Sequence, residues 1–250
     1  MEQAILEGHI SILAAIEAAS REIYGIQISK HQLDRPVQEL ERRARALGIP
    51  VQRVEPDIIL SQATGQTHGG VVAQVGPRRF VALGDLLAAK DRPLVVMLDG
   101  IEDPFNFGAA VRSLYAAGAD GLVLRPRNWM SAASTVGRSS AGASELIPTA
   151  IAETALDAAE FYRARGLRVA VAARGRSVSI YQADLAVPLF LAIGGEKRGL
   201  SRPLVQRADL RLEIPYGRQW PVSLGTASAT AVIAFEIMRQ RNAISSSRLP

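Results

Sequence analysis

The stretch LDGIEDPFNFGAAVRSLYAAGADGLVL, residues 98–124, indicates the fold class of this protein. It begins at the end of one apolar segment, passes through a helix-forming segment and ends in a second apolar segment. Apolar strands that alternate with helices are typical of a parallel sheet whose two faces are both covered. We therefore predict an α/β fold, with a strand, a helix and a strand in this stretch.

The same alternation continues through the C-terminal half of the chain. It predicts strands at residues 93–99, 121–126, 168–173, 189–194 and 210–215, and helices at residues 106–117, 153–165 and 223–241. Ligands of such sheets bind beyond the carboxyl ends of the strands. The loops that follow the first, fourth and fifth of these strands are therefore the candidate site.

A smaller α/β layer precedes this region. We expect helices at residues 6–19, 36–48 and 57–64, and strands at residues 21–29, 49–54 and 70–76. Gly48 suits the position just after the second helix, where a left-handed backbone is common. These patterns predict a small α/β domain of residues 1–78, a linker of residues 79–92 and a second domain of residues 93–245.

The composition is that of a globular protein with a basic C-terminal part. The chain has 250 residues, 48% of them hydrophobic and 21% charged. Twenty-six of the 29 basic residues are arginines; residues 1–80 hold nine basic and nine acidic side chains, so the net charge of +5 lies in residues 81–250. Arginine binds phosphates and stacks on bases, which suggests an RNA partner. A genome that prefers arginine codons explains the composition equally well.

The sequence lacks the signals of several other classes of protein and of functional site. The chain has no cysteine and three scattered histidines, so we expect no thiolate nucleophile and no metal site. No apolar run reaches the roughly 20 residues of a membrane span, and the first ten residues lack a signal-peptide layout. GGEKRG, residues 194–199, is neither a dinucleotide-binding fingerprint nor a P-loop. We expect a cytoplasmic protein.

Three ordered motifs in the candidate loops resemble those of a known family. The first is D-P-x-N-x-G-A-x-x-R-S at residues 103–113, the second is G-x-E-x-x-G at residues 194–199, and the third is I-P followed by S-L at Ile214, Pro215, Ser223 and Leu224. In this order they resemble the SpoU/TrmH-type RNA 2′-O-ribose methyltransferases of the SPOUT class. Residues 6–16 and 67–75 are similar to the ribosomal-protein-like substrate-binding domain that often precedes them.

The resemblance implies a reaction, a fold and partners. The reaction is methyl transfer from S-adenosylmethionine to a ribose 2′-hydroxyl of RNA, without a metal ion. Ribosomal RNA, in particular 23S rRNA, is favoured over tRNA because shorter tRNA-directed relatives commonly lack the N-terminal domain. The implied fold is a parallel-sheet SPOUT domain with a trefoil knot, which forms a homodimer through this C-terminal domain.

The resemblance also assigns Arg112 to the target nucleotide. A guanidinium group keeps its proton at neutral pH. We therefore expect Arg112 to bind a phosphate and to stabilise charge on the 2′-oxygen, instead of acting as a base. Without the motifs, a surface salt bridge to Glu102 or Asp103 is the alternative.

Three further residues complete the predicted catalytic set. Asn106 is expected to cap the helix that begins at Phe107, and thereby to make a rigid platform for Arg112. Glu196 is expected by resemblance to hold the loop or the arginine; a bare loop glutamate is otherwise solvated. Ser223 is expected to cap the last helix and to point into the site.

Four residues match positions where the family holds the adenosyl part of its cofactor: Gly194, Gly195, Ile214 and Leu224. Glycine lets the backbone approach a ligand closely, whereas isoleucine and leucine supply apolar walls for adenine. Without the resemblance, ordinary core packing at strand ends is the alternative for these residues.

One position departs from the family pattern. Gly225 stands where the family has an asparagine after Ser-Leu. We expect Ser223 or Thr226 to supply the missing hydrogen bond, so that activity is retained. If nothing compensates, the alternative is a non-catalytic RNA-binding or ribosome-assembly protein. A tRNA methyltransferase is a further alternative, and an oxidoreductase lacks its phosphate-binding fingerprint.

Overall fold

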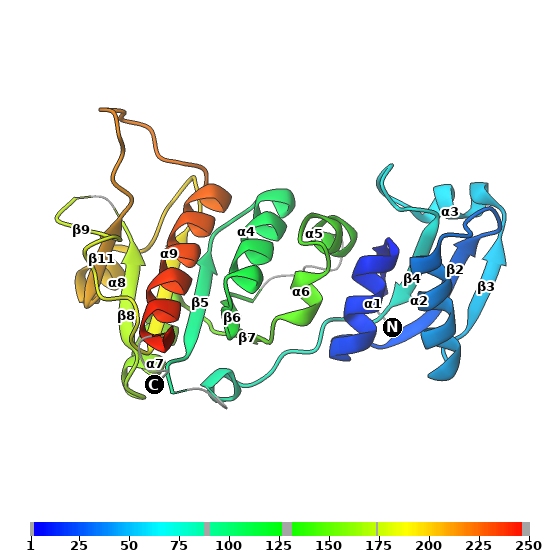
Figure 1. Ribbon diagram of the computed structural model, residues 1–250, viewed down its shortest axis with the longest axis horizontal. Helices are drawn as coiled ribbons and strands as arrows, with labels where there is room; N and C mark the ends of the chain where they lie inside the picture. Colours follow the sequence, from blue (N-terminus) through cyan, green and yellow to red (C-terminus); the bar gives the residue numbers. More distant parts are fainter. Residues whose placement is uncertain (1–2, 88–90, 127–131, 174, 247–250) are drawn as a thin grey trace. The chain divides into compact units, whose positions relative to one another are not determined.

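The structure is a computed structural model that describes residues 3–87, 91–126, 132–173 and 175–246. It divides into two compact units (Figure 1). The first contains Met1–Arg79 and Arg127–Leu146, and the second contains Phe80–Pro126 and Ile147–Pro250. No helix in the described ranges has both the length and the apolar composition needed to cross a membrane.

The first unit is built on a four-stranded sheet of order β1-β4-β2-β3. Its strands are β1 (Ala4–Glu7), β2 (Ile23–Ser29), β3 (Val51–Val54) and β4 (Val71–Val75); β2 and β3 run parallel, and the other two pairs run antiparallel. Helices α1 (His9–Ala18) and α2 (Arg35–Ala46) pack on one face through Ile12 and Leu40. Helix α3 (Pro56–Gln62) follows β3.

The end of α2 confirms the role predicted for Gly48. Gly48 has a φ of +72°, and its N–H donates to the carbonyl of Arg45 at 3.0 Å. The N–H of Ile49 donates to the carbonyl of Ala44 at 2.9 Å. These two bonds satisfy carbonyl groups that the end of a helix otherwise leaves open, in a Schellman motif.

Helices α5 (Ala133–Ser139) and α6 (Ala143–Leu146) belong to the first unit, although they follow β6 in the chain. Two ion pairs hold them there. Nη1 of Arg138 lies 2.9 Å from Oε2 of the fully buried Glu7, and Nε of Arg21 lies 3.1 Å from Oε2 of Glu145. The domain boundaries predicted from sequence do not anticipate this return of the chain, because it depends on contacts more than 100 residues apart.

The second unit contains a parallel sheet of seven strands in the order β7-β6-β5-β10-β8-β11-β9. The strands are β5 (Leu94–Asp99), β6 (Gly121–Leu124), β7 (Thr149–Ile151), β8 (Arg168–Ala172), β9 (Val178–Ser179), β10 (Leu189–Gly194) and β11 (Leu210–Glu213). All its pairs run parallel, which confirms the predicted α/β class. The predicted trefoil knot stays a prediction.

The helices of this unit are η1 (Leu83–Leu87), α4 (Pro104–Ala116), α7 (Ala155–Arg163), α8 (Arg202–Arg207) and α9 (Thr226–Ser246). Helices α4 and α9 lie side by side (Figure 1). Helix α7 covers the sheet through Tyr162, whose ring stacks on that of Phe190 at 5.1 Å. Burial of these apolar side chains is the main favourable contribution to the stability of the unit.

Every strand and helix predicted for the second unit is found, with ends shifted by a few residues. β7 and β9 were not predicted, because strands of three and two residues are too short to show a period. In the first unit, β1 was predicted as the start of the first helix for the same reason. Part of the predicted linker forms η1, and residues 88–90 lie outside the described residues.

Candidate active site

The three motif loops leave the same edge of the second sheet. β5 and β10 are neighbours, and Asp99 at the end of β5 is paired in register with Gly194 at the end of β10. β11 points the same way two strands further along. The loops at residues 100–103, 195–201 and 214–225 therefore meet where α/β sheets bind ligands.

The first two loops touch through their backbones. The N–H of Gly195 donates to the carbonyl of Asp99 at 2.7 Å, and a Cβ added to Gly195 would collide with the carbonyl oxygen of Gly100. A Cβ added to Gly194 would lie 2.6 Å from the carbonyl carbon of Gly199. Both glycines are therefore required by the packing of the chain on itself, besides the cofactor role expected of them.

The first loop ends at an N-cap that differs from the predicted one. Oδ1 of Asp103 accepts the N–H of Asn106 at 2.7 Å, and helix α4 begins at Pro104. The prediction that Asn106 caps a helix starting at Phe107 is therefore wrong. Proline favours the first position of a helix because its φ is already helical, and it holds Asp103 extended. Capping by Asp103 leaves the side chain of Asn106 available for other contacts.

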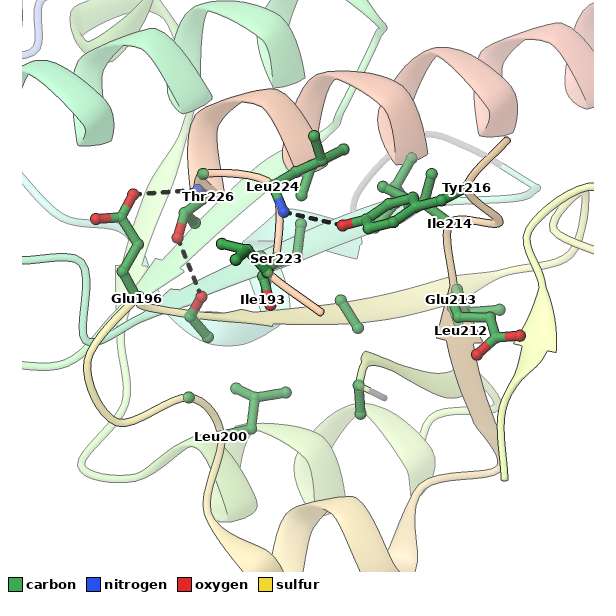
Figure 2. A pocket seen from close by; sticks show the side chains of 18 of the residues that line it. Ile193, Glu196, Leu200, Leu212, Glu213, Ile214, Tyr216, Ser223, Leu224 and Thr226 are labelled. Atoms are coloured by element: carbon green, nitrogen blue, oxygen red, sulfur yellow. Dashed lines mark hydrogen bonds between the residues drawn. The ribbon is translucent and has the colours of Figure 1, made fainter. Parts of the chain in front are cut away.

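Glu196 joins the second loop to the other two. Its Oε1 accepts hydrogen bonds from Nδ2 of Asn106 and from the N–H of Thr226, both at 3.2 Å. Oγ1 of Thr226 is also 3.5 Å from the carbonyl oxygen of Gly194. One carboxylate thus connects the start of α4, the loop after β10 and the start of α9. Figure 2 shows its bond to Thr226.

A hydrogen bond within the third loop closes its base. The hydroxyl oxygen of Tyr216 accepts the N–H of Leu224 at 2.9 Å (Figure 2). The ring of Tyr216 lies 6.1 Å from that of Trp220, whose side chain is exposed. Tyr216 is not among the site residues predicted from the sequence, although a tyrosine directly after Ile-Pro in a candidate loop is a recognisable signal.

A cavity of about 1220 Å³ lies against these loops. All four residues predicted to hold the cofactor line it, and so do two of the predicted catalytic residues: Gly194, Gly195, Ile214, Leu224, Glu196 and Ser223. Thr226 also lines the cavity, and it was expected only as a possible replacement for the family asparagine. The structure therefore brings together residues from the second and third motifs.

The lining fits S-adenosylmethionine in its chemistry. Ile193, Leu200 and Ile214 provide apolar surface suited to an adenine ring, and Glu196 and Glu213 add carboxylates. Pockets for small molecules typically enclose about 300–1,000 Å³ and combine mostly apolar walls with a few polar groups. This cavity is larger than that range, so it has room beyond the cofactor itself.

Arg112 is not among the residues that line this cavity. Its side chain is exposed on α4, and within the described residues it has no hydrogen-bond or ion-pair partner. The alternative of a salt bridge to Glu102 or Asp103 is wrong. Glu102 pairs with Lys197 at 2.6 Å, and Asp103 caps the helix. Arg112 is thus available to a phosphate or to a second protein chain.

Ser223 lines the cavity but does not cap α9. The helix begins at Thr226, and the N–H of Ala229 donates to the carbonyl of Gly225 at 3.0 Å. Gly225 therefore occupies the capping position, and the prediction that Ser223 caps this helix is wrong. The physical reason is that Ser223 precedes that position by two residues.

Comparison with protein families agrees with this geometry. The SpoU rRNA Methylase family model matches residues 93–235, and the model for RNA 2'-O ribose methyltransferase substrate binding matches residues 5–81. The first match covers the sheet, the cavity and all three motif loops. The second covers the β1–β4 sheet of the first unit.

Related proteins match nearly the whole chain. The 23S rRNA (guanosine-2'-O-)-methyltransferase RlmB of Haemophilus influenzae is 33% identical over 86% of this chain and 88% of its own length. RlmB of Shewanella oneidensis is 29% identical over 96% of this chain and 98% of its own length. An uncharacterized tRNA/rRNA methyltransferase of Synechocystis sp. is 35% identical over 95% of this chain, which spans 62% of that protein's length.

Solved structures show the same fold. The AdoMet-bound rRNA methyltransferase from Sinorhizobium meliloti has a TM-score of 0.79 at 25% identity, covering 95% of this chain and 87% of that one. The SpoU methyltransferase AviRb from Streptomyces viridochromogenes has a TM-score of 0.79 at 24% identity, covering 97% and 91%. The TrmH/SpoU tRNA modifying enzyme of A. aeolicus has a TM-score of 0.56 at 25% identity and covers 65% of this chain and 82% of its own.

Proposed function

Because this chain belongs to the SpoU rRNA methylase family, we propose that it transfers a methyl group from S-adenosylmethionine to a ribose 2′-hydroxyl in 23S rRNA. The observation that carries the proposal is the cavity at the carboxyl edge of the sheet, lined by residues of the second and third family motifs. Relatives named 23S rRNA methyltransferases match almost the full chain, including the N-terminal unit.

The chemistry needs binding and orientation more than a reactive side chain. S-adenosylmethionine, when bound, supplies an electrophilic methyl group. The ribose 2′-oxygen would attack this methyl carbon, with the sulfonium sulfur as the leaving group. Ile214 and Leu224 would hold the adenine, while Gly194 and Gly195 let the backbone run close to it.

Glu196 has a positioning role in this proposal. Its hydrogen bonds to Asn106 and Thr226 fix the mutual arrangement of the three loops. Fixed geometry matters because a methyl transfer requires the attacking oxygen in line with the leaving sulfur, and small displacements lower the rate strongly. Ser223, exposed on the cavity wall, is placed to meet the ribose.

Arg112 would bind the phosphate of the target nucleotide and stabilise the charge that develops on the 2′-oxygen. Its freedom from intramolecular partners among the described residues supports this role. A preorganised cation acts without taking the proton, which a guanidinium group cannot do at neutral pH. The proton passes to water or to the phosphate.

We further propose a homodimer through α4 and α9, which places Arg112 next to the site of the second copy. Three large hydrophobic side chains are exposed on these helices: Phe105 at 59%, Tyr115 at 43% and Phe235 at 45%. Exposed apolar surface of this kind favours association. A second copy explains why Arg112 lies outside the cavity of its own chain.

Ribosomal RNA is favoured over tRNA by the extent of the similarity. The tRNA modifying enzyme of A. aeolicus covers only 65% of this chain, whereas the RlmB proteins also cover the first unit. The basic excess in residues 81–250 supplies the charge that an RNA backbone requires. The RlmB relatives come from bacteria, where rRNA is made and assembled in the cytoplasm, so we place this enzyme there.

Two measurements test the proposal. Titration with S-adenosylmethionine should show saturable binding, and mapping of 2′-O-methylation should show one 23S rRNA site that is lost when the gene is deleted. If the gene is required for a methyl group on tRNA and rRNA is unmodified, the substrate is tRNA instead of 23S rRNA. Cofactor binding without transfer to either RNA would favour the non-catalytic binding protein, the alternative that Gly225 leaves open.

A further inference from the structure

The first unit contains a small cavity of its own, of about 160 Å³. It is lined from β2, β3, β4 and α3, and most of its polar lining consists of glutamine side chains. The lining includes Tyr24, Gly25, Gln27, Gln52, Gln62 and Gln74.

The cavity lies on the face of the sheet opposite α1 and α2. Side chains alternate between the two faces of a strand. Ile26 and Ile28 of β2 are buried in the core formed with α1 and α2, so Gln27 points the other way. Gln27 is paired with Gln52 of β3, and Gly25 is paired with Gln74 of β4. Three glutamines thus surround a glycine on one face.

Not every amide group that lines this cavity has a hydrogen-bond partner within the described residues. Nε2 of Gln62 donates to Oε1 of Gln27 at 2.6 Å, but Oε1 of Gln62 is buried without a hydrogen-bond partner. Within the described residues, the side chains of Gln52 and Gln74 make no hydrogen bond. Gln52 and Gln74 are exposed, so solvent satisfies their amides, whereas the buried Oε1 of Gln62 requires a donor that a ligand in the cavity can supply.

We propose that this cavity binds one unpaired nucleobase of the RNA substrate; the identification of the ligand as RNA rests on the function proposed above. A glutamine amide carries both a donor and an acceptor, the pair that base edges require. Unpaired bases are commonly splayed out and hydrogen-bonded along their edges, which is the contact that these amides can make.

The volume of the cavity and its uncharged lining both favour a single base as the ligand. The cavity is about half the lower limit of pockets that enclose a whole small molecule, roughly 300 Å³, so it suits one ring system. Its lining has no charged side chain, so it lacks the cation that most phosphate contacts use. The contact therefore adds base recognition, whereas phosphate contacts must come from arginines elsewhere.

Gly25→Ala tests the inference with little disturbance to the fold. A Cβ at Gly25, which lines the cavity, would meet only the carbonyl oxygen of Pro50 within 4 Å, at 3.8 Å. We expect the variant to bind an unmodified full-length 23S rRNA transcript roughly 5- to 150-fold more weakly, the range found for loss of one base contact. The weakening should be equal at low and high salt, because no phosphate contact is lost.

Gln52→Ala provides a second variant, since Gln52 is exposed and its truncation leaves the sheet backbone unchanged. Gln66→Ala, in an exposed loop of the same unit, is the matched control and should bind rRNA like wild type. Thermal unfolding identifies any variant that fails to fold. If folded Gly25→Ala and Gln52→Ala both bind rRNA with wild-type affinity, the inference is overturned.

Binding of free nucleosides separates this inference from the proposed function. In protein labelled with ¹⁵N-glutamine, adenosine, guanosine, cytidine or uridine should shift the side-chain amide signals of the wild type and not those of Gly25→Ala. Ribose 5-phosphate should shift none. No response to any nucleoside overturns the base site even if methyl transfer is demonstrated, and a response supports it even if no methyl transfer is found.

Discussion

Oε1 of Glu196 lies 3.2 Å from Nδ2 of Asn106, a hydrogen bond between residues 90 positions apart. The same oxygen accepts the N–H of Thr226, so one carboxylate connects three loops. Hydrogen bonds to an ionised acceptor are roughly twice as strong as neutral ones. The arrangement of the proposed active site therefore depends on the charge at Glu196.

We expect Glu196→Ala to lower methyl transfer by at least about tenfold, because two loops lose their common acceptor. Glu196→Gln keeps an acceptor oxygen without the charge and should retain an intermediate rate. Single-turnover rates and cofactor affinity are the measurements. Glu55→Ala, which breaks the exposed pair with Lys30, is the control and should have no effect on the rate. Equal rates for Glu196→Ala and wild type would refute the positioning role.

Arg112→Ala should reduce methyl transfer roughly 100- to 1,000-fold, the range for loss of one preorganised charge contact. S-adenosylmethionine affinity and unfolding temperature should stay near wild type, because Arg112 is exposed and lies outside the cavity lining. Labelled methyl incorporation and cofactor titration are measured side by side. Arg168→Ala, at the amino end of β8 on the opposite edge of the sheet, is the control. Near-wild-type transfer by Arg112→Ala contradicts its assignment.

Gly225→Asn should change turnover little. The N–H of Thr226 already donates to Glu196, so a contact at this junction exists without an asparagine. A Cβ at Gly225 would lie 3.5 Å from Oε1 of Glu196, an ordinary contact, and asparagine is a favourable helix N-cap. Single-turnover rates of methyl transfer to rRNA, measured for wild type and for Gly225→Asn, test this prediction. An inactive wild type that asparagine rescues, by at most about 1–3 kcal/mol, would favour the non-catalytic alternative.

Binding of rRNA should weaken steeply between low and physiological salt, because neutralisation of phosphates releases counterions. The excess charge lies in residues 81–250, so arginines of this part should account for the dependence. Replacing one arginine that contacts a phosphate should reduce the slope of log affinity against log salt by about 1. A flat dependence would mean that the basic excess is compositional only.

Glu236 should make unfolding sensitive to acid. Hydrogen bonds from Arg239 and Gln240 lower the pKa of its carboxyl group below the ordinary value of 4.5, although burial of the side chain acts in the opposite direction. A lowered folded-state pKa stabilises the fold above pH 4.5, and this stabilisation is lost as the pH falls through the folded-state pKa. Glu236→Gln should lower the free energy of unfolding at pH 7 and flatten its decline below pH 4.5. Urea unfolding at several pH values measures the free energy of unfolding of both proteins. If the two free energies change in parallel with pH, Glu236 does not contribute as predicted.

Most helices and strands of the second unit, and the edge of its sheet that carries the site, could be predicted from the sequence. The apolar runs of β5 and β10, the helix between β5 and β6, and Gly48 after α2 each follow from residues close together in the chain. Local signals of this kind suffice because hydrophobic periodicity and capping act within a few residues. The parallel sheet then places the ends of its strands at one edge.

The side-chain contacts of the site could not be predicted from the sequence and are seen only in the folded chain. The fold pairs Glu196 with Asn106 and Thr226, makes Asp103 the cap of α4, and leaves Arg112 outside the cavity. It also returns α5 and α6 to the first unit, through the pairing of Glu145 with Arg21 and of Arg138 with Glu7.

The physical reason is that these contacts join residues far apart in the sequence. A buried carboxylate needs a partner to offset its desolvation, but any of 26 arginines could supply one. The choice is made by the packing of whole helices and strands, which no local pattern contains.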